Sequence, residues 1–141
     1  MLIKISKHAD DAERIRDFKN KIDTRAGEVR KMYITDVPGQ QAVYMQKLEQ
    51  AQLFVADNQV ANNLIPYIVS EANARAVTKL QAAQLIIGIA DFWNVTLAPE
   101  IEGIRIKYKN DLDNLANPET APQVFRDAIN ALDQISITYP P

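Results

Sequence analysis

Apolar residues recur at steps of three or four along most of the chain, which is the spacing of one face of an α-helix. The longest run predicts a helix over residues 79–116. Pro99 falls inside it, and an interior proline loses a hydrogen bond and clashes with the preceding turn. We therefore expect a kink or short break near residues 95–99, with Pro99 restarting the helix. The apolar positions of this run are Ile86, Ile89, Trp93, Leu97, Ile101, Ile104, Tyr108, Leu112 and Leu115.

Four shorter runs with the same spacing predict four more helices. Thr78 and Gln81 form a capping box at the start of the long helix, and Asp10 with Glu13 resembles one at the start of the first helix. The four shorter helices cover residues 11–33, 38–56, 66–76 and 118–134. The apolar stripe of the second is Tyr44, Leu48, Ala51 and Val55.

Both ends of the chain carry short segments that look like β-strands. Leu2, Ile3 and Ile5 form a β-like start, and Ser136 to Tyr139 alternates polar and apolar residues. An isolated two-stranded piece is marginal in water. These segments would therefore pair with each other, add to the sheet of a partner, or remain loosely extended tails.

The predicted fold is all-α. We expect an antiparallel bundle of five or six helices with one long kinked helix and possible short β segments at both termini. The length of 141 residues is typical of one domain, so residues 1–141 are expected to form a single helical domain. Residues 1–9 and 136–141 are then partner-binding or loose terminal segments.

The amino-acid composition excludes several kinds of catalytic and metal-binding site. The chain has no cysteine and a single histidine, His8, so disulfides and thiolate metal sites are excluded. Phosphate-binding glycine loops and nucleophile-elbow motifs are absent from the sequence. Glu100 and Glu102, two residues apart, point to different faces of a helix. We therefore expect no catalytic, cofactor or metal site, and no enzyme activity.

Charge and hydropathy limit the partners. Residues 1–31 carry nine Lys or Arg against six Asp or Glu, whereas the whole chain has a net charge of −2. This uneven charge favours head-to-tail contacts or an acidic partner, or simply marks a solvated helix face. It is far from the basic excess of a nucleic-acid binder. No apolar run approaches a membrane span, and the start turns polar too early for a signal peptide, so a cytoplasmic product is expected.

Several residues are candidates for contacts with other proteins. Gly27, inside a helix, would allow another helix to approach closely. Arg30 lies seven residues after Asp23 on one face and could bridge to a carboxylate or a helix C-terminus, or lie on the plain surface. Phe92 cannot share a core with the adjacent Trp93, so it is either a surface anchor or is covered by a neighbouring helix. The terminal candidates are Leu2, Ile3, Ile5, Ile137 and Tyr139.

One segment resembles a known module. Residues 22–44 carry the pattern I-D-x-x-A-G-x-x-R-x-x-Y-I-T-x-x-P-G-Q-x-x-x-Y. It is similar to a helical module in tail, tail-fibre and baseplate-associated proteins of tailed bacteriophages, over roughly residues 20–110 of this chain. Ala76 departs from the pattern where a glycine is expected, and Pro99 interrupts a region that is usually continuous helix. Further matches are Ile65-Pro66-Tyr67, Glu71-Ala72, Val77-Thr78, Ala90, Trp93 and Ile101-Glu102-Gly103.

The resemblance implies a structural role in a virion and no catalytic residues. We expect an adaptor of a phage tail, baseplate or tail-fibre attachment site, made in the host cytoplasm. It would bind other tail proteins and be present in several symmetric copies. The alternative is an assembly chaperone that leaves before the virion matures. A small host-directed regulator or an undetected enzyme is the third interpretation.

Overall fold

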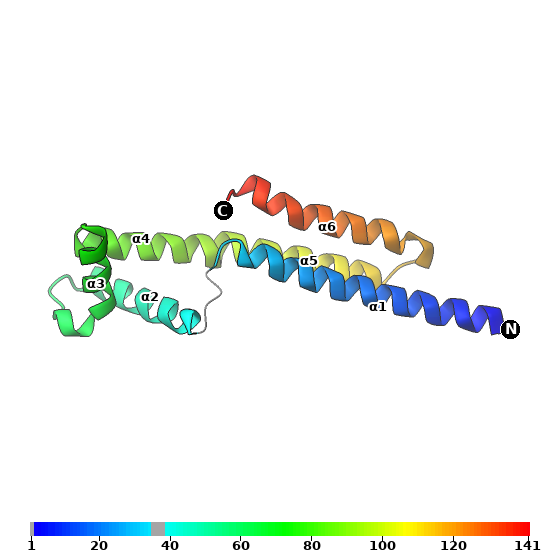
Figure 1. Cartoon of the computed structure of the whole chain (residues 1–141), viewed down its shortest axis with the longest axis horizontal. Helices are drawn as coiled ribbons and strands as arrows, with labels where there is room; N and C mark the ends of the chain where they lie inside the picture. The colour runs from blue at the N-terminus through cyan, green and yellow to red at the C-terminus, as the bar shows by residue number, and fades with distance from the viewer. Residues whose placement is uncertain (1, 35–38) are drawn as a thin grey trace. The chain divides into compact units, whose positions relative to one another are not determined.

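The computed structural model describes residues 2–34 and 39–141, with side chains described from residue 9 onward. Helices make up most of this part of the chain, and it contains no strand (Figure 1), which confirms the predicted all-α class. The chain divides into two compact units: unit 1 is Met1–Ile34 with Ala98–Pro141, and unit 2 is Thr35–Leu97. The expectation of one domain over residues 1–141 stays a prediction.

Unit 1 is built from both ends of the chain. Its helices are α1 (Leu2–Lys31), α5 (Ala98–Asp113) and α6 (Ala121–Thr138), which lie side by side (Figure 1). The Asn117 side chain caps the short 3-10 turn Pro118–Thr120 before α6 by accepting the Glu119 N–H. Ile101 is fully buried, as its place on the predicted long stripe implies. The other fully buried side chains of unit 1 are Ile22, Ala26, Val29, Ala121, Ala128 and Leu132.

Unit 2 is a smaller helical unit. It contains α2 (Gln40–Ala56), a 3-10 turn (Asn62–Leu64), α3 (Pro66–Arg75) and α4 (Lys79–Asp91). The predicted capping box at the start of α4 is confirmed: the Gln81 N–H donates to the Thr78 hydroxyl oxygen at 3.1 Å, and the Thr78 N–H donates to Gln81 Oε1 at 3.0 Å. The core of unit 2 consists of Ala51, Phe54, Ile65, Ile68, Ala72, Ala82, Ala83 and Ile86.

The predicted β segments are wrong at both ends. Helix α1 begins at Leu2, so the capping-box signal at Asp10 lies inside the helix and does not start it. Residues Leu2, Ile5, Ala9 and Ala12 keep steps of three and four, a helical spacing that the short alternating pattern obscured. Helix α6 likewise continues through Thr138.

The long helical run does not break at Pro99. A π-helical turn, Phe92–Leu97, follows α4 directly, and Pro99 is the second residue of α5. In an α-helix the Val95 carbonyl would need the N–H that Pro99 lacks. In π geometry each carbonyl reaches a donor five residues on, so the missing N–H does not interrupt the helix. The expected break is therefore replaced by a wider turn just before the proline.

The buried face of α2 differs from the predicted one. Ala51 is buried as expected, but Tyr44 is 41% and Val55 52% exposed. The buried neighbours of Ala51 are instead Gln50 and Phe54. Gln50 Oε1 accepts the Tyr67 N–H at 2.8 Å, which satisfies a free donor in the first turn of α3. Helix α2 is apolar on two adjacent stripes, so its sequence spacing could not select between them.

Ala76, where the module pattern has glycine, has a left-handed backbone with φ of 55° after the end of α3. This conformation costs an alanine about 1–2 kcal/mol more than a glycine. We expect Ala76→Gly to raise the free energy of unfolding by about 0.5–1 kcal/mol, because glycine's larger unfolded-state entropy offsets part of the gain. The measurement is urea unfolding. The control Ala74→Gly, inside α3, should lower stability by about 1 kcal/mol, and a loss in both variants would contradict the prediction.

Candidate interaction surfaces

An ion-pair network joins α1 to α5 in unit 1. Arg105 lies between two carboxylates, with Nη1 2.8 Å from Asp23 Oδ1 and Nη2 2.7 Å from Glu102 Oε1. Lys109 adds a second cation 2.8 Å from Asp23, and Arg30 Nη2 lies 2.7 Å from Glu102. Three of these four pairs join residues far apart in sequence, so the network sets the register of the two helices.

The network shifts the pKa values of its members. Burial raises the pKa of Asp23, but hydrogen bonds from Lys109 and Arg105 outweigh it, so the net pKa is lowered. The hydrogen bond from Arg105 is the main cause of the lowered pKa of Glu102; burial opposes it, and Arg30 lowers it further. Hydrogen bonds to Glu102 and then Asp23 raise the pKa of Arg105. These shifts keep Asp23, Glu102 and Arg105 charged at neutral pH.

Two predicted interaction residues lie beside this network. Arg30 does bridge to a carboxylate, as the sequence suggested, but that carboxylate is Glu102 of the same chain. Gly27 lies on α1 between Asp23 and Arg30, and a Cβ built on it would meet no atom within 4 Å. No other helix of the described chain therefore requires a glycine there, and a role of Gly27 toward a partner stays a prediction.

Hydrogen bonds join the C-terminal end of α6 to Tyr33, which follows α1. The Tyr33 hydroxyl donates to the Ile135 carbonyl at 3.3 Å and to the Tyr139 carbonyl, and burial raises the Tyr33 pKa. A hydrogen bond with Glu100 raises the pKa of Tyr139. Of the two predicted C-terminal contact residues, Tyr139 is therefore engaged within unit 1, whereas Ile137 is 69% exposed.

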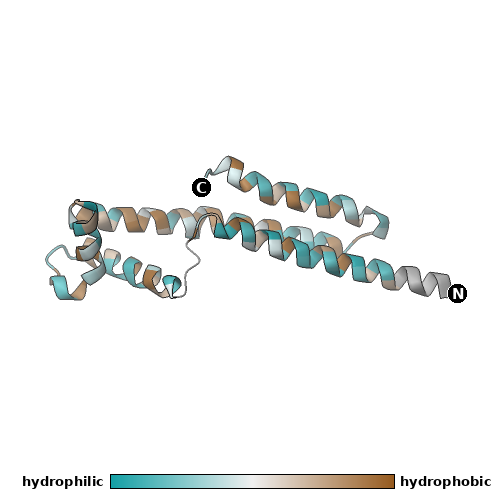
Figure 2. Cartoon of the chain, viewed as in Figure 1, coloured by the Kyte–Doolittle hydropathy of each residue, from teal (hydrophilic) through white to brown (hydrophobic). Residues whose placement is uncertain are grey.

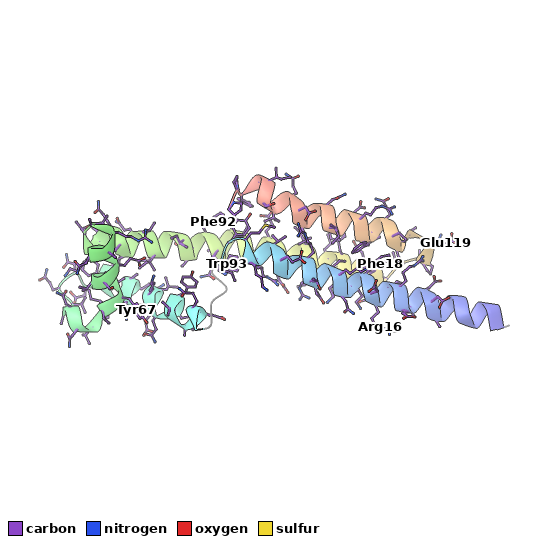
Figure 3. All side chains as sticks on the ribbon, in the orientation of Figure 1. Arg16, Phe18, Tyr67, Phe92, Trp93 and Glu119 are labelled. Carbon is purple, nitrogen blue, oxygen red and sulfur yellow. The ribbon has the colours of Figure 1, made fainter. Side chains whose placement is uncertain are left out.

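The remaining predicted contact residues are Phe92 and the N-terminal apolar residues. Phe92 begins the π-helical turn and is 40% exposed, and the adjacent Trp93 is half-buried (Figure 3). This arrangement fits the surface-anchor alternative. The side chains of Leu2, Ile3, Ile5 and His8 lie outside the described part of the structure.

Unit 2 carries most of the exposed apolar surface. Of the fifteen exposed large apolar side chains among the described residues, eleven belong to unit 2, and much of α4 is brown in Figure 2. We call these eleven the apolar surface of unit 2: Tyr44, Met45, Leu53, Val55, Leu64, Val77, Leu80, Leu85, Ile89, Phe92 and Val95. Sequence reasoning singled out only Phe92 among them, because it expected Tyr44, Val55 and Ile89 to be core residues.

Charged residues, unlike exposed apolar ones, are concentrated in unit 1. Residues 35–97 contain three Lys or Arg and five Asp or Glu, whereas the rest of the chain contains thirteen of each sign. Exposed apolar side chains in unit 2 are therefore rarely flanked by charges. Exposed apolar side chains in such number favour contact with another macromolecule.

An open groove of about 440 Å³ lies between α1 and α6 in unit 1. Phe125, which stacks on Phe18 with 4.6 Å between ring centroids, lines it together with Ile129. Three cations line it: Arg25 pairs with Glu28 and Asp133, Lys21 pairs with Asp17, and Arg126 donates a hydrogen bond to Gln123 Oε1 at 2.8 Å.

Within the described residues, no group of three or more His, Asp or Glu side chains is arranged to hold a metal ion. None of the helices in that part of the chain has the length and apolar character needed to cross a membrane. Searches of protein-family models, curated proteins and solved structures found no match to this chain.

The network generates a stability prediction. Arg105→Gln removes the cation shared by Asp23 and Glu102, which are both about 40% exposed, so solvent screens part of the effect. We expect a loss of about 1 kcal/mol in the free energy of unfolding, reduced at high salt. Urea unfolding at two salt concentrations is the measurement. The control Lys107→Gln removes an exposed pair within α5 and should cost less; an equal loss in both variants would argue against the network.

The lowered pKa values of Asp23 and Glu102 generate a second prediction. Both carboxyls have folded pKa values below their ordinary values of 3.8 and 4.5, so the unfolded chain binds more protons in acid. Their contribution is present above the unfolded pKa values and is lost as pH falls through the folded ones. The double variant D23N/E102Q should therefore lose less stability than the wild type between about pH 5 and pH 2. Parallel curves of unfolding free energy against pH would contradict this.

Proposed function

We propose that this protein acts by binding other proteins, as a structural adaptor of a phage tail, baseplate or tail-fibre attachment site. The observation that carries the binding role is the apolar surface of unit 2, where large side chains such as Met45 (67% exposed) and Val95 (73% exposed) lie open to solvent. Its place in a tail is supported by the resemblance of residues 20–110 to the phage module.

The two units suggest a division of roles. Unit 1 is rich in charge, and its helices are joined by paired residues, which suits a stable support. Unit 2 has few charges and exposes apolar helix faces, as the core of a protein interface does. We therefore infer that unit 2 makes the main contact with a heterologous tail protein, through α2, which carries Tyr44, Met45, Leu53 and Val55.

The helical ends of the chain bear on the choice between a permanent adaptor and a temporary chaperone. Strand-like termini would have favoured permanent addition to a partner sheet over the reversible grip of a chaperone. Since both ends are helical, only the composition of the virion separates an adaptor from an assembly chaperone.

The test of the adaptor role is mass spectrometry of purified virions. We expect this chain in mature particles, in a fixed ratio to a tail protein. Its absence from virions together with co-purification with tail proteins from infected cells would overturn the adaptor role and support the chaperone. Absence from both samples would overturn the phage assignment altogether.

A matched pair of variants tests which surface binds. Met45 in unit 2 and Ile137 in unit 1 are 67% and 69% exposed, so a lysine at either position should be tolerated by the fold. We expect Met45→Lys to reduce incorporation into virions more than about tenfold, and Ile137→Lys to leave it near the wild-type level. The reverse result would transfer the contact to the C-terminal segment. Circular dichroism checks that both variants are folded.

A further inference from the structure

A polar pocket of about 290 Å³ lies between α2 and α3 of unit 2. Residues 35–97 contain only three Lys or Arg residues, and two of them line this pocket. We call it the α2–α3 pocket. Its lining residues are Lys47 from α2 and, from α3, Tyr67, Ser70, Glu71, Ala74 and Arg75.

The two cations of the pocket share one carboxylate. Lys47 Nζ lies 3.4 Å from Glu71 Oε1, and Arg75 Nη2 lies 3.2 Å from the same oxygen. Glu71 is the only acidic residue that lines the pocket. The pocket therefore carries a surplus of one positive charge, although unit 2 as a whole contains more acidic than basic residues.

Glu71 holds these cations loosely. Both distances are longer than the roughly 2.7–2.9 Å of a typical charge-assisted hydrogen bond. Glu71 Oε2 is buried and accepts no hydrogen bond from the described residues, so both cations contact a single oxygen. The Arg75 side chain is 50% exposed. Because its guanidinium carries more N–H donors than Glu71 uses, Arg75 can bind a second acceptor from outside.

Two hydroxyl groups add to the donors. Tyr67 and Ser70 line the pocket, and neither side chain forms a hydrogen bond with the described part of the chain. Several donors and one surplus positive charge fit a group with one negative charge and several acceptor sites, which describes a carboxylate. A nucleic acid would need more cations than the single other one in unit 2, Lys79.

We propose that the α2–α3 pocket binds the carboxylate of an aspartate or glutamate side chain on the partner protein. This inference rests on the proposed function, because it assigns the pocket to the same partner that contacts α2. Lys47 lies three residues after Tyr44, and residues at this spacing are neighbours on a helix. The pocket therefore adjoins the apolar surface of unit 2, and it selects a partner that presents an acidic side chain beside apolar ones.

The first test is a titration with blocked glutamate, N-acetyl-glutamate N-methylamide, at constant ionic strength. Nuclear magnetic resonance of the isotope-labelled full chain should show shifts at residues 67–75, with a dissociation constant in the millimolar range. Blocked glutamine should leave these signals unchanged. Equal shifts with both probes, no shifts up to about 100 mM probe, or tighter binding of inorganic phosphate would overturn the proposal.

The cation is tested with a matched pair of variants. Arg75→Gln and Lys79→Gln each remove one positive charge from unit 2, but Lys79 does not line the pocket. Arg75→Gln should raise the dissociation constant of blocked glutamate at least about fivefold, because it removes a charge-assisted hydrogen bond. Lys79→Gln should leave the constant near the wild-type value. An equal effect of the two variants would show a general charge effect and overturn the pocket.

Glu71→Gln separates a binding pocket from a purely structural ion pair. The change keeps the shape of the side chain and raises the positive surplus from one charge to two. We expect blocked glutamate to bind at least about threefold more tightly, because the competing carboxylate is neutral. An unchanged or weaker affinity in a folded Glu71→Gln protein would contradict the proposal. If circular dichroism shows that this variant is unfolded, the pair Arg75→Gln and Lys79→Gln decides.

The titration needs no virion, so the pocket and the adaptor role fail in different experiments. A chain that is present in virions but binds no blocked glutamate would overturn the pocket alone. A chain that binds the probe but is absent from virions would support the carboxylate site and overturn the adaptor role.

Discussion

The contact of Arg105 with Asp23 and Glu102 is the interaction on which unit 1 depends. It joins two helices that are more than sixty residues apart in the chain, and Lys109 and Arg30 extend it along both helices. A solvent-exposed ion pair contributes little to stability by itself. A network of charges in defined positions sets register, because any shift of one helix along the other would separate several pairs at once.

Unit 1 takes α1 from one end of the sequence and α5 and α6 from the other, so unit 2 is inserted between them along the chain. Unit 2 has its own core around Phe54, Ile68 and Ile86, and it keeps much apolar surface exposed. An exposed apolar surface leads to aggregation unless it is small, binds only reversibly or is covered by a partner protein. The proposed contact of α2 with a tail protein assigns such a partner to this unit.

The candidate contact residues show how far sequence reasoning reached. It singled out Arg30 and Phe92, and it left open whether Arg30 bridges to a carboxylate, meets a helix C-terminus or lies on the plain surface; the structure pairs Arg30 with Glu102. An arginine's partner cannot be inferred from its own helix, because the carboxylate lies 72 residues away. Met45, Leu85 and Ile89 were not singled out, since an apolar residue at helical spacing is normally a core residue.

The sequence by itself determined the helices and the local signals at their ends. Spacing of three and four specified the helices apart from the two ends of the chain, and the Thr78–Gln81 pair marked the start of α4, because these features depend on residues within one or two turns. Only the tertiary structure decided which stripe of α2 is buried, how the chain passes Pro99 and that both ends are helical. The buried stripe of α2 and the course of the C-terminal end depend on contacts between distant segments, namely Gln50 with Tyr67 and Tyr33 with the end of α6. A periodic pattern records how apolar a face is, whereas burial depends on which neighbour covers it.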